Sequence, residues 1–216
     1  KFSILSPDGD QGLPGNFDIS VTYTVTEDNG LKITYDGVSD KDTFVSMTNH
    51  SYFNLNGENS DSILEHELMS AADAFTPANE EMIATGEILD VTGTAMDFRT
   101  VKKIGRDIEL DELPLKIGSG YDHNWAINEH KEDEEIVRLS SEESGIVLKV
   151  YTDYPGIQVY TGNFLLDKPG KRGRIYPNRS AVALETQQYP NAVSRPNFPS
   201  PLLKAGEKFH TETEYR

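Results

Sequence analysis

Phe17-Asp18-Ile19-Ser20-Val21-Thr22-Tyr23-Thr24-Val25 alternates apolar and polar side chains at every position. A period of two is typical of a β-strand that turns one face to a core and the other to solvent. Asp28-Asn29-Gly30 follows, and Asn-Gly is a strong hairpin signal because both central residues of a type I′ turn have positive φ. Residues 31–35 resume the alternation, so we expect an antiparallel hairpin.

Short apolar runs separated by turn residues continue to the end of the chain. They lie at 64–69, 83–91, 98–104, 136–139, 146–150, 157–160 and 181–184, and residues 207–215 alternate like an edge strand. No ordinary amphipathic helix fits between them, and residues 1–16, 109–120 and 168–174 have the composition of loops. The pattern predicts an all-β fold of antiparallel strands, in a single domain over residues 1–216 because no linker is visible.

Charge and composition limit the kinds of molecule that the protein is expected to bind. The 216 residues include 20 Lys and Arg against 36 Asp and Glu, a formal net charge of −16, which repels nucleic-acid phosphates and anionic membrane surfaces. No apolar run is long enough to span a bilayer. The absence of cysteine excludes disulfides, thiolate metal sites and a cysteine nucleophile. We therefore expect a small neutral ligand, with no nucleic acid and no membrane as partner.

Two titratable residues stand out as candidates for proton transfer. His50 follows the apolar run Phe44–Met47, which predicts a buried strand, and a histidine can give or take a proton near neutral pH. Glu185 ends the apolar run 181–184, where an ionised carboxylate is unfavourable unless it is paired or used. Each has a structural alternative: a lone histidine is more often structural, and Glu185 could pair with Arg179 or Arg195.

Other polar residues carry weaker signals. Asp122 and its neighbour His123 point to opposite faces of a strand, so only one of them can face a given pocket. Gln158 alternates with Ile157 and Val159 and faces either solvent or a polar cleft. The five histidines lack chelating spacing, and there is no glycine-rich phosphate loop, so neither a metal nor a cofactor is expected. Ser51 lies in no nucleophile motif.

Several motifs together resemble the galactose mutarotase (aldose 1-epimerase) family. They are TNHSYFNL at 48–55, GYDHNW at 120–125, PGIQVYTGNFL at 155–165 and LETQ at 184–187, with lesser matches at 72–77, 86–88, 96–99, 198–201 and 206–207. Because these matches follow one another in order, the resemblance covers nearly the whole chain. It implies a large antiparallel β-sandwich with an open cleft, a cytoplasmic location, and interconversion of the α and β anomers of a free hexose, galactose or glucose.

The resemblance also assigns roles to residues. His50 matches the family's general acid and Glu185 its general base, so the two are expected to converge on one pyranose. Ser51 and Tyr52 lie on the same sugar-contacting stretch as His50. Asp122 matches a residue that holds sugar hydroxyls, and Gln158 matches one that lines the cleft. Tyr52 or Trp125 is expected to stack on the apolar face of the sugar.

One departure from the family pattern leaves alternatives open. Full-length members carry a front segment with a further histidine and an arginine that contact the sugar, and this sequence begins after that segment. We expect the sandwich to be incomplete on its N-terminal side, either as a fragment or as a part that a separate chain completes. A non-catalytic carbohydrate-binding sandwich and a glycoside hydrolase that uses Asp122 with Glu185 are the competing hypotheses.

Overall fold

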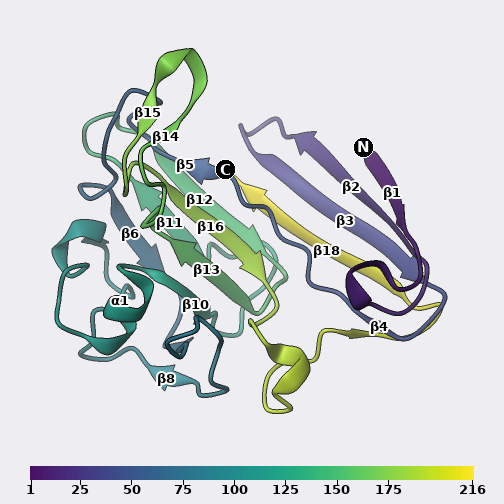
Figure 1. Cartoon of the computed structure of the whole chain (residues 1–216). Coiled ribbons are helices and arrows are strands. Elements are labelled where there is room, and N and C mark those ends of the chain that lie inside the picture. The colour runs from purple at the N-terminus through teal and green to yellow at the C-terminus, as the bar shows by residue number, and fades with distance from the viewer.

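Two large antiparallel sheets form the body of the computed structural model, which describes residues 1–216 (Figure 1). The first has eight strands in the order β1 (Phe2–Ser6), β2 (Phe17–Val25), β3 (Leu31–Ser39), β18 (Lys208–Tyr215), β12 (Val147–Thr152), β11 (Val137–Ser140), β6 (Glu67–Ser70) and β9 (Lys102–Lys103). The second has six, in the order β5 (Tyr52–Phe53), β16 (Val182–Gln187), β13 (Gly156–Tyr160), β10 (Asp122–Ala126), β7 (Ala74–Thr76) and β8 (Leu89–Asp90). The predicted all-β sandwich is confirmed.

Smaller elements connect or flank these sheets. Two short pairs are β4 (Thr43–Phe44) with β17 (Leu202–Leu203), and β14 (Lys168–Pro169) with β15 (Ile175–Tyr176). The α-helix is α1 (Leu113–Gly118), and 3₁₀ turns lie at Asp10–Gly12, Ile104–Arg106, Lys171–Gly173 and Ala192–Ser194. No helix has the length and apolar character that crossing a membrane requires.

The alternating stretch 17–25 forms the predicted strand and hairpin. Strand β2 pairs with β3 over its whole length, from Phe17 opposite Ser39 to Val25 opposite Leu31. The predicted type I′ turn is wrong, because only Asn29 has a positive φ, of 67°. The connection is instead a five-residue loop, residues 26–30, whose ends are joined by two hydrogen bonds. The backbone N–H of Thr26 donates to the Gly30 carbonyl, and the backbone N–H of Gly30 donates to the Thr26 hydroxyl, each at 2.8 Å.

The core lies where the inner faces of the two sheets meet. Ile33, Leu139 and Val150 come from the eight-stranded sheet, and Trp125, Ile157 and Leu184 from the six-stranded sheet; all six side chains are almost completely buried. Full burial of one such aliphatic side chain contributes about 1.5–3 kcal/mol. The residues between them along each strand point away from the core, because side chains alternate across a sheet.

The six-stranded sheet covers only part of this inner face. Phe2 lies opposite Val21, which in turn lies opposite the core residue Tyr35, so β1 and β2 continue the same apolar face. Yet Phe2 and Ile4 are 72% and 68% exposed. In Figure 1 the purple strands β1 and β2 extend beyond the edge of the six-stranded sheet.

Several expectations about local structure were wrong. The C-terminal strand β18 is not at an edge but lies between β3 and β12. Residues 1–16 contain β1, and the predicted loop 109–120 contains α1. Of the run Phe44–Met47 before His50, only Phe44 lies in a strand, β4, whereas β16 continues beyond Glu185 to Gln187. For the strands, pairing with segments distant in the chain decides the outcome, and a local sequence pattern does not contain that information.

Candidate active site

The outer face of the six-stranded sheet gathers polar side chains into cross-strand rows. Asn124 lies opposite Gln158, and Gln158 lies opposite Glu185, on three adjacent strands. In the next row Asp122 lies opposite Tyr160. The residues before and after them in the chain point into the core. Because side chains along a strand point alternately to the two faces of a sheet, these polar residues lie on the face away from the core.

A cavity of about 410 Å³ opens on this face. Four of the residues predicted from the sequence line it, namely His50, Asp122, Gln158 and Glu185. Sequence reasoning missed the other four, which are Tyr160, Phe164, Gln187 and Pro190. A signal for two of them was present, because Tyr160 and Gln187 each follow a predicted site residue by two positions along a strand and therefore share its face.

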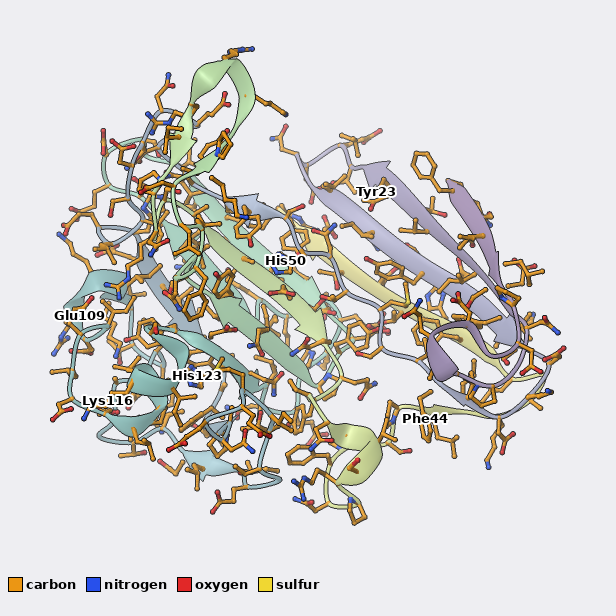
Figure 2. All side chains as sticks on the ribbon, viewed as in Figure 1. Tyr23, Phe44, His50, Glu109, Lys116 and His123 are labelled. Carbon is orange, nitrogen blue, oxygen red and sulfur yellow. The ribbon has the colours of Figure 1, made fainter.

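His50 and Glu185 meet in this cavity. Nε2 of His50 lies 3.4 Å from Oε1 of Glu185, so the carboxylate pairs with the imidazole. The two arginines considered as alternative partners do not reach it: Arg179 pairs with Glu109, and Arg195 forms no ion pair. Glu185 is only 8% exposed, whereas about half of the His50 side chain is open to solvent. Figure 2 shows His50 in front of the six-stranded sheet.

Burial and neighbouring charge set the acidity of Glu185. Removal from water raises the pKa of the Glu185 carboxyl above its ordinary value, because burial disfavours the charged form. The nearby His50 opposes this shift, and the carboxylate of Asp122 adds to it. A carboxylate with a raised pKa is a stronger base than a solvated one, so this environment suits proton abstraction.

A hydrogen-bonded network of polar side chains lines the cavity next to Glu185. Nε2 of Gln158 donates to Oδ1 of Asp122 at 2.7 Å, and Nε2 of Gln187 lies 3.3 Å from both Oε1 of Gln158 and Oδ1 of Asn124. Burial raises the pKa of Asp122, and the bond from Gln158 and the charge of His50 act against that shift. Gln158 therefore faces the polar cleft rather than open solvent.

Two buried tyrosines fix the extended segment that carries His50. The backbone N–H of Met47 donates to the Tyr154 hydroxyl at 3.0 Å, and the Tyr35 hydroxyl donates to the Thr48 carbonyl at 2.9 Å. Beyond the segment, the ring of Tyr52 lies 5.0 Å from that of His50, between centroids. The imidazole thus reaches the cavity from an anchored backbone and is packed against an aromatic ring.

Three residues considered from the sequence lie outside the cavity. Trp125 is wrong as a stacking platform, because it is fully buried and its Nε1 donates to the Met96 carbonyl at 2.9 Å in the core. Ser51 is exposed and does not line the cavity. Tyr52 also does not line it, but contacts His50 from the side and faces a neighbouring cavity.

Two further histidines serve the structure. Nε2 of His66 accepts a hydrogen bond of 2.9 Å from the backbone N–H of Leu55, and His66 is fully buried. His123 points into the core from the strand that carries Asp122, and burial lowers its pKa to about 4. Burial lowers the pKa of both imidazoles and so favours their neutral form.

The fold and this site define an antiparallel β-sandwich protein with a carboxylate–imidazole pair and a hydrogen-bonded group of polar side chains on the outer face of one sheet. The model of the aldose 1-epimerase family matches residues 1–216. The chain belongs to this family.

Individual relatives agree with this assignment. The chain is 46% identical to the galactose mutarotase of Sus scrofa, a match that covers 99% of this chain and 61% of the pig protein. It is 41% identical to the aldose 1-epimerase of Haemophilus influenzae, over 100% of this chain and 63% of that protein. A crystal structure of an aldose epimerase homologue from C. elegans superposes with a TM-score of 0.87 at 35% identity, covering 99% of this chain and 63% of that one. The chain thus spans about three fifths of the length of these relatives.

Proposed function

We propose that the protein is an aldose 1-epimerase that interconverts the α and β anomers of a free aldohexose, galactose or glucose. The observation that carries this proposal is the 3.4 Å contact between His50 and Glu185 in a cavity that Asp122 and Gln158 also line. The names of the similar proteins, galactose mutarotase and aldose 1-epimerase, support it.

The reaction needs a base and an acid that act on two oxygens of one carbon. Glu185 as the carboxylate removes the proton from the C1 hydroxyl, and the C1–O1 bond becomes a carbonyl while the bond from C1 to the ring oxygen breaks. His50 as the imidazolium gives its proton to that ring oxygen. Because both oxygens are bonded to C1, acid and base must lie close together, and the observed contact meets this requirement.

The open-chain aldehyde then rotates about its C1–C2 bond and closes by the reverse steps. Glu185 returns its proton to O1, and neutral His50 takes back the proton of the ring hydroxyl, so both residues are regenerated. Each proton-transfer group contributes about 100- to 10,000-fold in rate. The reaction needs no redox cofactor, since no electrons leave or enter the sugar.

Asp122 and Gln158 are assigned an orienting role. Gln158 donates to one oxygen of Asp122, which leaves the other oxygen free to accept from sugar hydroxyls. Groups that hold the remote hydroxyls keep the sugar in place while C1 turns, and such positioning lowers the entropic part of the barrier. The rings of Tyr160 and Phe164 supply apolar surface on the same cavity.

The geometry favours this reaction over glycoside hydrolysis. Hydrolases of glycosides generally place two carboxyl groups on either side of the scissile bond. Here the group in contact with Glu185 is an imidazole, and the second carboxyl, Asp122, is bonded to Gln158.

Replacing the base tests the proposal. In the full-length protein, Glu185→Gln should lower the rate at which freshly dissolved α-glucose reaches anomeric equilibrium, measured by polarimetry, by about 100-fold or more. Sugar binding, measured by calorimetry, should change little because the shape of the side chain is kept. Glu132→Gln, at an exposed glutamate without a hydrogen bond, is the matched control. Turnover retained by Glu185→Gln would refute the assignment of the base.

A further inference from the structure

The strand that carries Glu185 is tied to the eight-stranded sheet on both sides of that residue. The Tyr215 hydroxyl donates to the Leu184 carbonyl at 2.6 Å. The hydroxyls of Thr186 and Thr213 are hydrogen-bonded at 2.5 Å. Leu184 and Thr186 are the chain neighbours of Glu185 on β16, and their two partners lie on β18. The proposed reaction assigns no role to these contacts.

One edge of β16 is open beside Glu185, and Tyr215 takes the place of a strand neighbour there. The edge strand β5 pairs with Val182 and Ala183 alone, so on that side no strand runs beside β16 from Leu184 onward. A buried backbone carbonyl without a partner is unfavourable. The Tyr215 hydroxyl supplies the missing hydrogen bond to Leu184. Burial raises the pKa of this hydroxyl, so it stays protonated and can donate.

The bond at Thr213 belongs to a chain of buried hydroxyl groups with a fixed direction. The Thr152 hydroxyl donates its proton to the Glu212 carbonyl at 2.9 Å, since a carbonyl only accepts. Thr213, whose hydroxyl lies 3.0 Å from that of Thr152, must therefore donate to it, and Thr186 must donate to Thr213. The three threonines are each only 2% exposed, and a low-dielectric environment strengthens such bonds.

The same chain of hydrogen bonds reaches the segment that carries His50. The Thr152 hydroxyl also accepts from the backbone N–H of Tyr154, at 3.3 Å. The Tyr154 hydroxyl in turn accepts from the backbone N–H of Met47, three positions before His50, at 3.0 Å. The two members of the His50–Glu185 pair are thus held through one connected set of buried hydrogen bonds.

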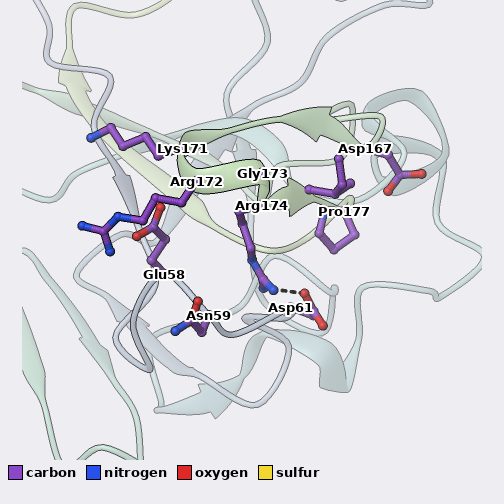
Figure 3. A pocket seen from close by; sticks show the side chains of 10 residues that line it. Glu58, Asn59, Asp61, Asp167, Lys171, Arg172, Gly173, Arg174 and Pro177 are labelled. Carbon is purple, nitrogen blue, oxygen red and sulfur yellow. Dashed lines mark hydrogen bonds and ion pairs between the residues drawn. The ribbon is translucent and has the colours of Figure 1, made fainter.

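The side chain of Glu185 has no comparable anchor of its own. Its carboxylate accepts no hydrogen bond within the protein, and its ion pair is with His50, whose side chain is about half exposed. The basic residues of the hairpin β14–β15, which precedes β16, line a separate cavity of about 530 Å³, where Arg174 pairs with Asp61 at 2.5 Å (Figure 3). The backbone of β16, which the bonds from β18 hold, therefore sets the place of the carboxylate.

We propose that Tyr215 and Thr213 are positioning residues for Glu185. They hold β16 so that the carboxylate lies at the distance from His50 at which both groups act on one sugar carbon. This inference rests on the proposed function. Neither residue lines the active-site cavity, because both are buried between the sheets, behind β16. Loss of either bond should therefore slow the reaction and leave sugar binding intact.

Removing the Tyr215 hydroxyl tests the first bond. In the full-length protein, Tyr215→Phe keeps the ring, whose centroid lies 5.2 Å from that of Phe53, and removes only the donor. We expect kcat for mutarotation of glucose, measured by polarimetry, to fall about 3- to 10-fold with KM unchanged. This is less than the roughly 100-fold cost of a full ångström of misplacement, because β13 still pairs with β16. Tyr121→Phe is the matched control: it removes another buried hydroxyl, which donates to the Ala95 carbonyl outside the cavity, and should leave kcat unchanged.

A pair of substitutions tests the bond from Thr213. Thr213→Val keeps the shape of the side chain but removes the hydroxyl, so kcat should fall by a similar factor, again with KM unchanged. Thr213→Ser keeps the hydroxyl and should retain the wild-type kcat. Unchanged kcat in Tyr215→Phe or Thr213→Val would overturn the role of that residue. An equal loss of kcat in Tyr121→Phe would overturn both roles, since it would show a general effect of lost stability.

Hydrogen exchange separates this inference from the proposed function. In Tyr215→Phe the backbone amides of residues 184–186 should exchange about 2- to 10-fold faster than in the wild type, the effect of one buried hydrogen bond, and Tyr121→Phe should leave them unchanged. If the wild-type protein anomerises no sugar, faster exchange still supports the hold of β18 on β16, and only the function is refuted. If the wild type is active while exchange and kcat of Tyr215→Phe are normal, the function stands and the inference is refuted.

Discussion

The two faces of the six-stranded sheet differ completely, although the same strands build both. The inner face carries Trp125, Ile157 and Leu184 in the core, and the outer face carries Asp122 and Glu185 in the candidate active site. Leu184 and Glu185 are neighbours in the chain and point in opposite directions. Stability and chemistry are therefore assigned to alternate residues, and each can be changed with limited effect on the other.

Truncation on the inner face should have the largest effect on stability. Trp125→Ala removes a fully buried ring and its hydrogen bond to Met96, and should lower the free energy of unfolding by about 3–5 kcal/mol. Denaturant titration of the full-length protein measures it. Tyr52→Ala, at a half-exposed aromatic residue on the outer side, should cost less than about 1 kcal/mol. Similar losses for the two variants would show that the faces are not independent.

A substitution in the outer-face network should weaken sugar binding without unfolding the protein. Gln187→Leu removes the amide that lies 3.3 Å from both Gln158 and Asn124, so Gln158 holds Asp122 less firmly. We expect KM for the monosaccharide to rise about 2- to 10-fold, the effect of one hydrogen bond, with kcat nearly constant. Gln188→Leu is the control, because its buried side-chain oxygen has no hydrogen-bond partner. A fall in kcat with unchanged KM would contradict this positioning role.

The smallest expected effect is a pH-dependent change in stability when Glu185 is replaced. Its raised pKa means that the folded state holds this proton more tightly than the unfolded state, so ionised Glu185 lowers stability at neutral pH. Glu185→Gln should therefore melt slightly higher at neutral pH, by less than about 4 °C, the shift that about 1 kcal/mol produces at this chain length. The difference should shrink as the pH falls through the raised pKa of Glu185. A lower melting temperature for Glu185→Gln at neutral pH would contradict the dominance of burial over the His50 pair.

The sequence pattern predicted what depends on neighbours in the chain. Alternation over residues 17–25 predicted β2, and the same rule placed Gln158 opposite to Ile157 and Val159. The same rule could also have shown that Trp125 is not in the site. Asp122 and Trp125 are three positions apart on one strand, so when Asp122 faces the site Trp125 faces the core. The all-β class followed from these local periods.

The sequence pattern could not predict which strands pair when they are distant in the chain. Nothing in residues 207–215 indicates that β18 inserts between β3 and β12, because its partners are far away in the chain. The meeting of His50 with Glu185, across 135 positions (185 − 50), was expected only from the resemblance to a family. Register between β10, β13 and β16 then decided which polar residues share a row.

A double-mutant cycle on His50 and Glu185 tests most directly whether the two act as one acid–base pair. Mutarotation rates are compared for His50→Asn, Glu185→Gln and the double variant of the full-length protein. Since the two proton transfers belong to one reaction step, the double variant should be about as slow as the slower single variant. If the two losses multiply instead, the residues contribute independently, and the proposed mechanism is wrong.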